Sequence, residues 1–361
     1  MKIAIVHDYL FTKGGGERVV LALAKRFKAP IYTTTYLPDK TYPEFKKLKI
    51  FSQPVKFLKS PLLQTEASFK FRRLDLSQYD LIISSGNWAK HVGIRENNHP
   101  QIHYEHTPVR AFYDLYENTK NRLSFIQRQI FEACVWYMKK LDQKTIKKID
   151  KIVTNSQNTR NRIQKFYNRD AEVIYPPVDI EKFKYKPNEN YFLSVQRIVP
   201  EKRIEIQLDV FRKLPNEELL IVGKPSEAYM SYFEKIKKDA PKNVEFLGSV
   251  SDNKLIDLYA KSKAVIQTSI DEDFGIVPVE AMASGKPCLA VNEGGFRETI
   301  INEKTGLLID KPYVKNFVDV IKNFDKYNFD HKICRRRAEE FSEDNFIMKM
   351  EEAINNLLEK R

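Results

Sequence analysis

Short, largely apolar runs of four or five residues recur along the chain and alternate with longer stretches of mixed polarity. An apolar run of this length predicts a strand buried on both faces, as in a parallel sheet covered by helices. Strands that alternate with helices predict an α/β fold with doubly wound parallel sheets. The runs that predict strands are residues 2–6, 80–84, 101–105, 151–154, 191–195, 218–222, 264–268, 288–291 and 306–309.

The stretch YPPVDIEKFKYKPNENY, residues 175–191, interrupts this alternation. It holds three prolines and shows no helical period, which is typical of a connector. A chain of 361 residues is long enough for two domains of ordinary size. We therefore predict one Rossmann-like domain over residues 1–176, a second over residues 177–341, and a final helix over residues 342–361, for which Ser342 is a suitable N-cap.

Composition narrows the class of protein. Apolar residues make up 42% and charged residues 30% of the chain, as in globular proteins. No apolar run approaches the length of a membrane span, and the first ten residues lack the layout of a signal peptide. The three cysteines are far apart, which fits a reducing compartment and argues against a disulfide framework or a zinc site. We expect a cytoplasmic protein.

Charge is distributed unevenly along the chain. Residues 1–180 contain 31 Lys and Arg residues against 17 Asp and Glu residues, whereas the remainder contains 30 against 31. The net charge of +13 therefore comes from the first half. Such an excess suggests an anionic partner, either a membrane surface or nucleic acid. A lysine-rich composition that merely keeps the protein soluble is the alternative explanation.

The stretch DEDFGIVPVEAMASG, residues 271–285, follows a predicted strand and carries two glutamates, Glu272 and Glu280, on either side of an apolar run. Pro278 suits the first position of a helix, and Gly285 suits the residue just after its end. Glu280 would then lie in the first helical turn, where a negative charge is favourable. The pattern predicts a strand, a loop and the start of a helix.

The backbone between these glutamates offers hydrogen-bond donors. The N–H groups of Phe274, Gly275 and Ile276 would lie near the helix N-terminus, which is a natural site for an anion. Carboxylates on both sides of such donors suit a ligand with hydroxyls at both ends and a diphosphate between them, as in a sugar nucleotide. An acidic helix start beside a solvated loop carboxylate would give the same pattern.

Two further strand ends in the second domain carry candidate residues. Arg197 and Lys202 follow one predicted strand and flank the turn at Pro200, so that both cations could converge on a diphosphate. Two solvated surface charges are the alternative. In the stretch NVEFLGSV, Gly248 would give room for a ligand and Val250 a wall for a base.

The first domain has two candidate stretches. Gly14, Gly15 and Gly16 follow the first strand and open a helix, so their amides could face an anion. Their spacing matches neither a dinucleotide fingerprint nor a P-loop, and a flexible turn is the alternative. His106 directly follows another strand, before Pro108, and could hydrogen-bond a sugar hydroxyl or assist in proton handling. A structural histidine is the alternative.

Together and in this order, these stretches closely resemble glycosyltransferase family 4, the retaining enzymes of the GT-B fold, in which two Rossmann-like domains flank a cleft. The resemblance spans nearly the whole chain. It is carried by GGGERV, EHTPVR, VTNSQNTRNRI, YPPVD, SVQRIVPEKR, FLGSV and EDFGIVPVEAMASGKP followed by NEGGFRETI. HDYL with GGGERV and HTPVR is most similar to the bacterial polysaccharide and O-antigen mannosyltransferases.

The resemblance implies a role for each charged candidate. Arg197 and Lys202 match the pair that binds the donor diphosphate. Glu272 matches the glutamate that contacts the donor-sugar hydroxyls, and Glu280 matches the one that binds the ribose. His106 matches a histidine near the sugar. The implied catalytic residues are therefore Glu272, His106, Arg197 and Lys202.

The resemblance also implies roles for backbone and apolar positions. The amides of residues 274–276 would hold the sugar and the phosphates, and Val250 would lie beside the nucleobase. Gly15 and Gly16 match the loop of the first, acceptor-binding domain that faces the diphosphate and the acceptor. The final helix, residues 342–361, would pack back on the first domain.

The chain departs from the family pattern at two positions. Asp273 stands where the family has a small residue, which would alter sugar choice. Lys202 is followed by Arg203 where the family has glycine, which would add a cation near the phosphates. Residues 271–273, DED, imitate the metal-binding motif of another glycosyltransferase fold. We expect no metal, because cations are already available to neutralise the diphosphate.

The implied activity is retaining transfer of a sugar, mannose from GDP-mannose, to a hydroxyl of a lipid-linked or polysaccharide acceptor, without a cofactor and without nucleic acid. A UDP-sugar donor, and a sugar-nucleotide epimerase or phosphorylase on the same fold, are the open alternatives. Nucleic-acid binding is the remaining alternative, although no recognisable module supports it. The aromatic and basic stretch over residues 121–151 suits peripheral contact with the anionic inner face of the cell membrane. A buried helix with solvated lysines explains this stretch equally well.

Overall fold

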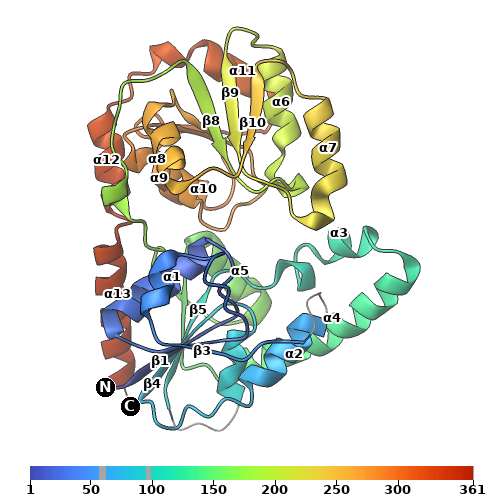
Figure 1. The fold of residues 1–361 in the computed structure, drawn as a ribbon, viewed down its shortest axis with the longest axis vertical. Coiled ribbons are helices and arrows are strands. Elements are labelled where there is room, and N and C mark those ends of the chain that lie inside the picture. Colours follow the sequence, from blue (N-terminus) through green and yellow to red (C-terminus); the bar gives the residue numbers. More distant parts are fainter. Residues whose placement is uncertain (57–61, 95–98, 361) are drawn as a thin grey trace. The chain divides into compact units, whose positions relative to one another are not determined.

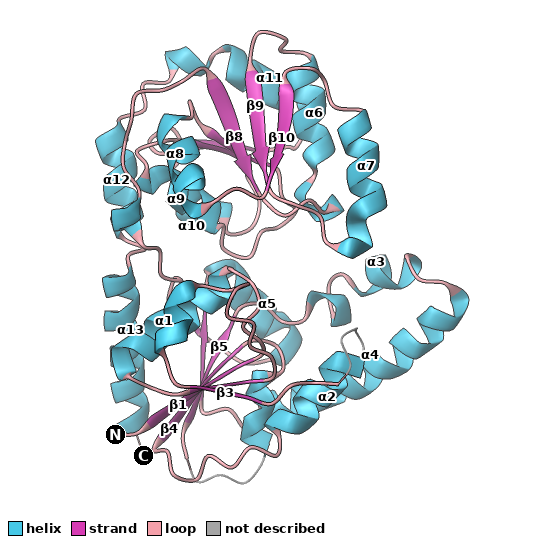
Figure 2. Cartoon of the chain, viewed as in Figure 1, coloured by secondary structure: helices cyan, strands magenta, loops and turns pink. Residues whose placement is uncertain are grey.

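The computed structural model describes residues 1–56, 62–94 and 99–360. The chain divides into two compact units, each built around its own parallel sheet (Figures 1 and 2). The first unit comprises Met1–Pro177 together with Glu343–Arg361, and the second comprises Val178–Ser342. In the described part of the chain, no helix is both long and apolar enough to cross a membrane.

The first unit contains a seven-stranded sheet of order β3-β2-β1-β4-β5-β6-β7, in which every neighbouring pair is parallel. Its strands are β1 (Ile3–His7), β2 (Ile31–Thr33), β3 (Ile50–Ser52), β4 (Leu81–Ser85), β5 (Gln101–Glu105), β6 (Lys151–Thr154) and β7 (Glu172–Val173). Its helices are α1 (Gly15–Phe27), α2 (Leu62–Phe71), α3 (Tyr116–Asn121), α4 (Phe125–Ile146), α5 (Gln157–Tyr167) and α13 (Glu343–Leu358), with 3₁₀ turns η1 (Pro43–Lys47), η2 (Ala89–Ile94) and η3 (Arg110–Phe112).

Helices α1 and α13 pack together in the first unit, although they come from opposite ends of the chain (Figure 1). Leu23 of α1 belongs to the same buried cluster as Phe346 and Met350 of α13. The ring of Phe346 lies edge-on against that of Tyr104 in β5, with centroids 6.0 Å apart. The final helix therefore completes the core of the first unit.

The second unit contains a six-stranded parallel sheet of order β10-β9-β8-β11-β12-β13. Its strands are β8 (Tyr191–Val195), β9 (Glu218–Val222), β10 (Val244–Gly248), β11 (Val265–Gln267), β12 (Cys288–Val291) and β13 (Gly306–Ile309). Its helices are α6 (Ile204–Arg212), α7 (Met230–Lys238), α8 (Asp252–Lys261), α9 (Ile276–Ala283), α10 (Phe296–Thr299), α11 (Val314–Lys322) and α12 (His331–Glu339), with 3₁₀ turns η4 (Ile180–Lys182), η5 (Pro200–Lys202), η6 (Glu227–Tyr229) and η7 (Phe324–Lys326).

Each predicted apolar run forms a strand, with ends that differ by no more than one or two residues. The predicted runs omit β2, β3 and β7, which are two or three residues long. They also omit β10, of which only the end was recognised, in the stretch NVEFLGSV. Strands β3 and β7 are the two edges of the first sheet and lack a continuous buried run. Too few buried residues remain in such strands to distinguish them from loops.

Candidate functional site

The loops that follow β8 and β11 lie where the strand order of the second sheet reverses. Ligands of open parallel sheets bind outside the carboxyl ends of the strands at such a point. Two hydrogen bonds join these loops: the Ile270 N–H donates to the Glu201 carbonyl at 2.8 Å, and the Thr268 hydroxyl donates to the Lys202 carbonyl at 2.7 Å. Segments about 70 residues apart are thereby held together.

Lys202 and Glu272 form an ion pair at this point, with 2.5 Å between Nζ and Oε2. Their side chains are only 16% and 24% exposed. Burial acts to raise the pKa of Glu272, but the Lys202 ammonium and the nearby Arg197 outweigh it and hold that pKa below its ordinary value. Glu272 is therefore an ionised carboxylate that can only accept hydrogen bonds.

Arg197 lies on the loop after β8 and is exposed. It is close enough to Glu272 to lower the pKa of that carboxyl. None of the hydrogen bonds and ion pairs found among residues 1–56, 62–94 and 99–360 involves its guanidinium. The structure thus brings together three of the residues that the sequence singled out, Arg197, Lys202 and Glu272, and leaves one cation exposed.

Arg203, expected as a further cation near the phosphates, is engaged differently. Its guanidinium forms two hydrogen bonds with the carboxylate of Glu293, at 3.0 and 3.2 Å. Glu293 also accepts a hydrogen bond from the backbone N–H of Asp271 at 3.3 Å. The charge of Arg203 is therefore partly neutralised, and the residue fastens the loop after β12 to the segment after β8. Through the Asp271 N–H, Glu293 also joins the loop after β12 to the loop after β11. The sequence pattern gave no signal for this pairing.

Gly294 and Gly295 allow those two loops to meet backbone to backbone. The Gly295 N–H donates to the carbonyl of Glu272 at 2.8 Å. A Cβ on Gly294 would lie 2.4 Å from the same carbonyl oxygen, and the residue has a positive φ of 56°. A Cβ on Gly295 would lie 2.5 Å from the Cα of Phe274. A larger residue at either glycine would push the backbone of the Glu272 loop away. The sequence pattern did not show this constraint.

Helix α9 begins earlier than predicted. Gly275 is its N-cap, with a φ of 87°, and Ile276 is its first residue. Pro278 is therefore the third helical residue, where a missing N–H costs nothing because the first four N–H groups have no intrahelical partner. Glu280 lies in the second turn instead of the first, is buried, and accepts a hydrogen bond from the Tyr259 hydroxyl at 2.7 Å. The prediction of a first-turn glutamate was wrong, because the left-handed conformation of Gly275 ends the loop before the proline.

The remaining candidates of the second unit occupy separate positions. Phe274 is buried beneath the loop, with its ring 5.5 Å from that of Phe341. Val250 lies beyond β10, two strands away from β8 in the sheet, and directly precedes Ser251, the N-cap of α8. Its place beside a base stays a prediction.

In the first unit, the strand order reverses between β1 and β4. His7, Ser85 and His106 meet there, at the carboxyl ends of β1, β4 and β5. The Nδ1–H of His7 donates to the Ser85 carbonyl at 2.8 Å, and the Ser85 hydroxyl is hydrogen-bonded to Nε2 of His106 at 2.8 Å. A Cβ on Gly16 would lie 3.3 Å from the same Nε2 atom. The structure thus brings His106 and Gly16 together, as the family resemblance implies, and adds His7 and Ser85.

The electrostatic state of His106 limits its chemistry. Burial, and after it the neighbouring His7, lower the pKa of this imidazole to about 3. The ring is therefore neutral at physiological pH. A base with so low a pKa removes protons poorly. The arrangement favours the expected hydrogen bond to a hydroxyl over the expected proton handling.

The start of α1 already has a carboxylate beside it. Gly14 is the N-cap, and Gly15 and Gly16 are the first two helical residues. Glu17 is buried, accepts a hydrogen bond from the Thr12 hydroxyl at 2.6 Å, and lies where a Cβ on Gly14 would meet its Oε2 atom at 2.6 Å. A negative charge at this end partly satisfies the helix dipole. The expected contact of Gly15 and Gly16 with a diphosphate stays a prediction.

Asp8 is a buried carboxyl that holds the loop after β4. It accepts hydrogen bonds from the backbone N–H groups of Asn87, Trp88 and Ala89 at 2.6–2.8 Å. Burial raises its pKa, while His7 and these three donors oppose the rise. The sequence pattern did not single out this residue. Its position two residues after the first apolar run, just beyond the carboxyl end of β1, was the available signal.

Over the residues that the structure describes, no three His, Cys, Asp or Glu side chains are grouped closely enough to hold a metal ion. The DED stretch gives no such group. Asp271 has a positive φ of 44°, and its N–H donates to Glu293, as described above.

Two family models match the chain. Residues 13–182 match the model for Glycosyltransferase Family 4, and residues 177–341 match the model for Glycosyl transferases group 1. The first coincides with most of the first unit and the second with nearly all of the second unit.

Two curated relatives are mannosyltransferases. The O-antigen chain mannosyltransferase RfbU of Salmonella typhimurium is 32% identical over 209 residues, 56% of this chain and 57% of that protein. The alpha-1,3/1,6-mannosyltransferase ALG2 of Mus musculus is 28% identical over 255 residues, 60% of this chain and 61% of that protein. The alignments thus span less than two thirds of either relative.

Solved structures share the architecture. The structure of Anabaena Alr3699/HepE in complex with UDP has a TM-score of 0.77 at 18% identity, covering 99% of this chain and 100% of that one. Sucrose-phosphate synthase from Thermosynechococcus elongatus has a TM-score of 0.76 at 16% identity and covers both chains fully. These likenesses and the two sheets confirm the predicted GT-B fold class. Because these two glycosyltransferase models together account for residues 13–341, the chain is a glycosyltransferase.

Proposed function

We propose that the protein transfers mannose from GDP-mannose to a hydroxyl of a lipid-linked or polysaccharide acceptor. The observation that carries sugar transfer is the group formed by Arg197, Lys202 and Glu272 at the strand-order reversal of the second sheet. The mannosyl donor is supported by the two mannosyltransferase relatives, RfbU and ALG2.

The chemistry of transfer explains the cations. Breaking the bond between the anomeric carbon and the diphosphate oxygen of the donor leaves negative charge on the departing diphosphate. Arg197 and Lys202 would stabilise that charge as it develops, and each such contact contributes roughly 2 to 4 kcal/mol in the transition state. Because Arg197 is exposed, it can reach a phosphate without first breaking another ion pair.

The Lys202–Glu272 ion pair suits the same ligand. Each partner neutralises the other in the unliganded protein. A sugar diphosphate offers hydroxyl donors to the carboxylate of Glu272 and anionic oxygens to the ammonium of Lys202. Both partly buried groups would therefore stay satisfied when the donor replaces part of their mutual contact, which limits the desolvation cost of binding.

The first unit would bind the acceptor. The neutral ring of His106, fixed by Ser85, offers a hydrogen bond to a sugar hydroxyl without adding charge. Retention of configuration and independence from metal complete the proposal. Retention comes from the family resemblance, and independence from metal rests on the cations available to neutralise the diphosphate. No side chain is assigned as a nucleophile, and the leaving diphosphate would take the acceptor proton.

A thermal-shift screen against GDP-mannose, UDP-glucose and ADP-glucose tests the donor, because a ligand that binds the native state raises stability with its occupancy. GDP-mannose should give the largest rise in Tm. A larger rise with UDP-glucose would overturn the mannosyl donor and leave sugar transfer in place.

Product analysis tests the reaction. Incubation with donor and a mannan oligosaccharide should lengthen the oligosaccharide by one sugar and release the nucleoside diphosphate. Conversion of the donor into an isomer without an acceptor would indicate an epimerase. Release of a sugar phosphate would indicate a phosphorylase. Either result would refute the proposed transfer.

A further inference from the structure

Helix α4 exposes large apolar side chains along its first half. Sixteen large hydrophobic residues are exposed in the described part of the chain, and five of them fall within thirteen positions of this helix. They are Phe125, Ile126, Ile130, Trp136 and Tyr137, with exposed fractions of 76, 72, 50, 62 and 46%. Single exposed apolar residues are ordinary, but such a cluster marks an interaction surface.

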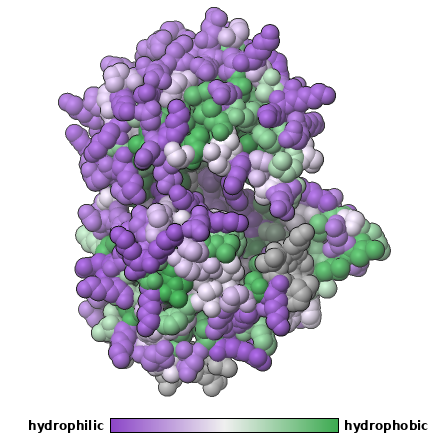
Figure 3. Space-filling model, in the orientation of Figure 1, coloured by the Kyte–Doolittle hydropathy of each residue, from purple (hydrophilic) through white to green (hydrophobic). Residues whose placement is uncertain are grey.

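The opposite face of α4 packs the helix against the rest of the first unit. Val135, Met138 and Leu141 are buried against the first sheet in a cluster that includes Trp88 and Phe112. The helix therefore needs no outward apolar residues to stay docked. Figure 3 shows apolar, green side chains gathered on the protrusion that α3 and α4 form in Figure 1. We name the five exposed side chains the apolar tip.

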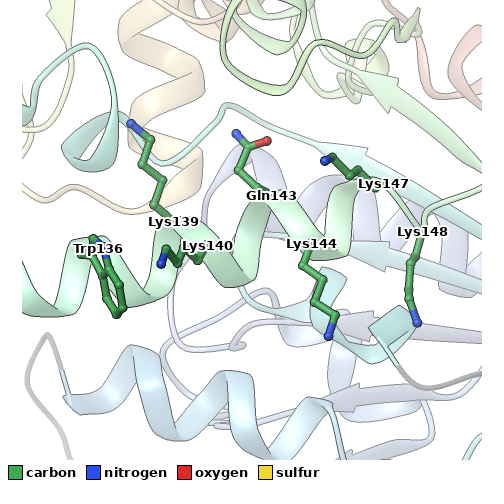
Figure 4. Close-up of a pocket in the computed structure, with 7 residues that line it drawn as sticks. All are labelled: Trp136, Lys139, Lys140, Gln143, Lys144, Lys147 and Lys148. Carbon is green, nitrogen blue, oxygen red and sulfur yellow. The ribbon is translucent and has the colours of Figure 1, made fainter.

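The last turns of α4 and the two residues that follow the helix are cationic on the outside. Lys139, Lys140, Lys144, Lys147 and Lys148 line a hollow of about 570 Å³ together with Trp136 and Gln143 (Figure 4). We name these five lysines the lysine stem. The ammonium of Lys140 lies 3.8 Å from the centre of the Trp136 ring, where the apolar tip and the lysine stem meet.

Four lysines of the stem are not neutralised by acidic neighbours. Among the ion pairs between described residues, none involves Lys139, Lys140, Lys144 or Lys147. By contrast, Lys120 on the neighbouring helix α3 is paired with Glu132 at 2.5 Å. The stem therefore keeps most of its positive charge.

Another helix of the same sheet shows that this pattern is not a general property of the unit. Helix α5 also buries one face, yet its exposed residues are polar, namely Gln157, Asn161, Gln164 and Lys165. An apolar tip followed by a lysine stem is the pattern of a segment that lies at a lipid–water interface, with apolar groups at the acyl boundary and cations among the phosphates.

We propose that the outer face of α4 binds the surface of a bilayer that contains anionic phospholipids. The apolar tip enters the interface, and the lysine stem lies in the phosphate layer. This inference stands on α4 alone and does not depend on the proposed reaction. Nucleic acid would leave the apolar tip uncovered, and a second copy of the chain would bring two lysine stems together, which repel each other.

Vesicle flotation of the full chain tests the proposal. The probes are vesicles of phosphatidylcholine alone and vesicles of phosphatidylcholine mixed with phosphatidylglycerol, at low salt. We expect at least about tenfold stronger binding to the anionic vesicles, since each lysine near such a surface contributes about fivefold. Equal binding to both vesicles, or none, would overturn the proposal.

Two variants separate the charged and apolar contributions. Replacing Lys139, Lys140, Lys144 and Lys147 together by Gln should abolish binding to anionic vesicles. The matched control replaces four exposed lysines of the second unit, Lys235, Lys237, Lys238 and Lys242, by Gln and should bind like the wild type. Equal losses in both would show that net charge alone acts, and would refute a site on α4.

The apolar tip has its own test. Phe125→Ser with Ile126→Ser and Ile130→Ser should leave binding that moderate salt reverses, whereas wild-type binding should survive that salt. Tyr313→Ser with Ile333→Ser is the matched control for loss of exposed apolar area. A tip variant that resists salt as well as the wild type would overturn the insertion of the tip.

Tryptophan fluorescence reports insertion directly. The chain has two tryptophans: Trp88 is buried and Trp136 is exposed. Anionic vesicles should shift the emission to shorter wavelength, and Trp136→Phe should remove the shift. An unchanged wild-type spectrum on vesicle-bound protein would refute insertion. Nucleotide-sugar thermal shifts should be equal in the wild type and the lysine variant, which separates this inference from the proposed reaction.

Discussion

The two units place their candidate residues at equivalent points of two similar sheets, yet the chemistry at those points differs. At the reversal between β8 and β11, the second unit presents the charged groups of Arg197, Lys202 and Glu272. At the reversal between β1 and β4, the first unit presents the neutral ring of His106, linked to Ser85. Topology thus determines where a ligand can bind, whereas a few side chains determine which ligand fits.

Under the proposed function, the two units would have opposite electrostatic tasks. A departing diphosphate needs cations, and the second unit would supply two of them. An acceptor hydroxyl needs orientation without added charge, and the first unit would supply a neutral imidazole. Substitutions at the two points should therefore affect different measurements: turnover and donor affinity in the second unit, and the pH dependence of stability in the first.

Lys202→Ala should have the largest effect. We expect turnover, measured as nucleoside diphosphate release at saturating donor, to fall about a hundredfold, because one lost contact to developing charge costs about 10² to 10³ in kcat. Glu272→Ala should reduce turnover at least about tenfold. The double variant should lose less than the product of the two, since the partners share one ion pair.

Lys213→Ala, an exposed lysine that follows α6, is the control for these variants and should turn over like the wild type. Unchanged turnover in both Lys202→Ala and Glu272→Ala, with an unchanged Tm, would refute the assignment of the charged group to the donor.

Gly294→Ala tests the close contact between the loops after β11 and β12. The added Cβ would lie 2.4 Å from the Glu272 carbonyl, so we expect both donor affinity and unfolding free energy to fall. Gly248→Ala is a matched control, because Gly248 also has a positive φ but nothing lies within 4 Å of its Cβ position. Denaturant unfolding should show Gly294→Ala less stable by about 1 to 3 kcal/mol than Gly248→Ala. Equal losses would mean that the positive φ alone matters.

His106 should give the wild type a characteristic pH dependence. Its pKa is about 3 in the native state and ordinary, near 6.5, in the unfolded state. Between these values the unfolded chain binds more protons, so stability falls as pH drops from about 6.5 towards 3, with a slope of at most about 1.4 kcal/mol per pH unit.

Denaturant unfolding of the wild type and His106→Gln across this range measures that contribution. The stability difference between the two proteins should shrink as pH falls. A difference that stays constant with pH would show that His106 titrates normally and is not the neutral group described above.

Arg203→Gly should have the smallest effect. It removes a partly exposed ion pair, which contributes about 0 to 1 kcal/mol, and relieves a left-handed backbone, which costs about 1 to 2 kcal/mol. The unfolding free energy should therefore change little, and turnover should stay close to that of the wild type. A loss as large as that of Lys202→Ala would instead place Arg203 on the diphosphate and contradict its pairing with Glu293.

The apolar pattern of the sequence was sufficient to locate the buried strands and the residues that follow them. Strands β5, β6, β8, β9, β12 and β13 have the predicted ends, because each is a short, mostly buried segment rich in apolar residues. Arg197, Glu272 and His106 could be singled out for the same reason: each follows such a segment. The apolar pattern could not reveal β3 and β7, whose short edge strands carry little burial.

The ion pairs could not be predicted from local patterns. Lys202 and its partner Glu272 are 70 residues apart in the sequence, and Arg203 and its partner Glu293 are 90 residues apart. Sequence reasoning assigned Arg203 to the phosphates because it follows Lys202, but adjacent residues on a tight turn point in different directions. The early start of α9 was missed because Pro278 was a stronger signal than the positive φ of Gly275.

The sequence by itself thus determined the fold class, the buried strands and the types of side chain that follow them, because burial periodicity is written in neighbouring residues. Only the tertiary structure decided which of those side chains meet and in which charge state. Strand order places the ends of β8 and β11 side by side. The nearby cations lower the pKa of Glu272 against the effect of burial, whereas burial itself lowers the pKa of His106. Both effects depend on residues that are distant along the chain and become neighbours only when it folds.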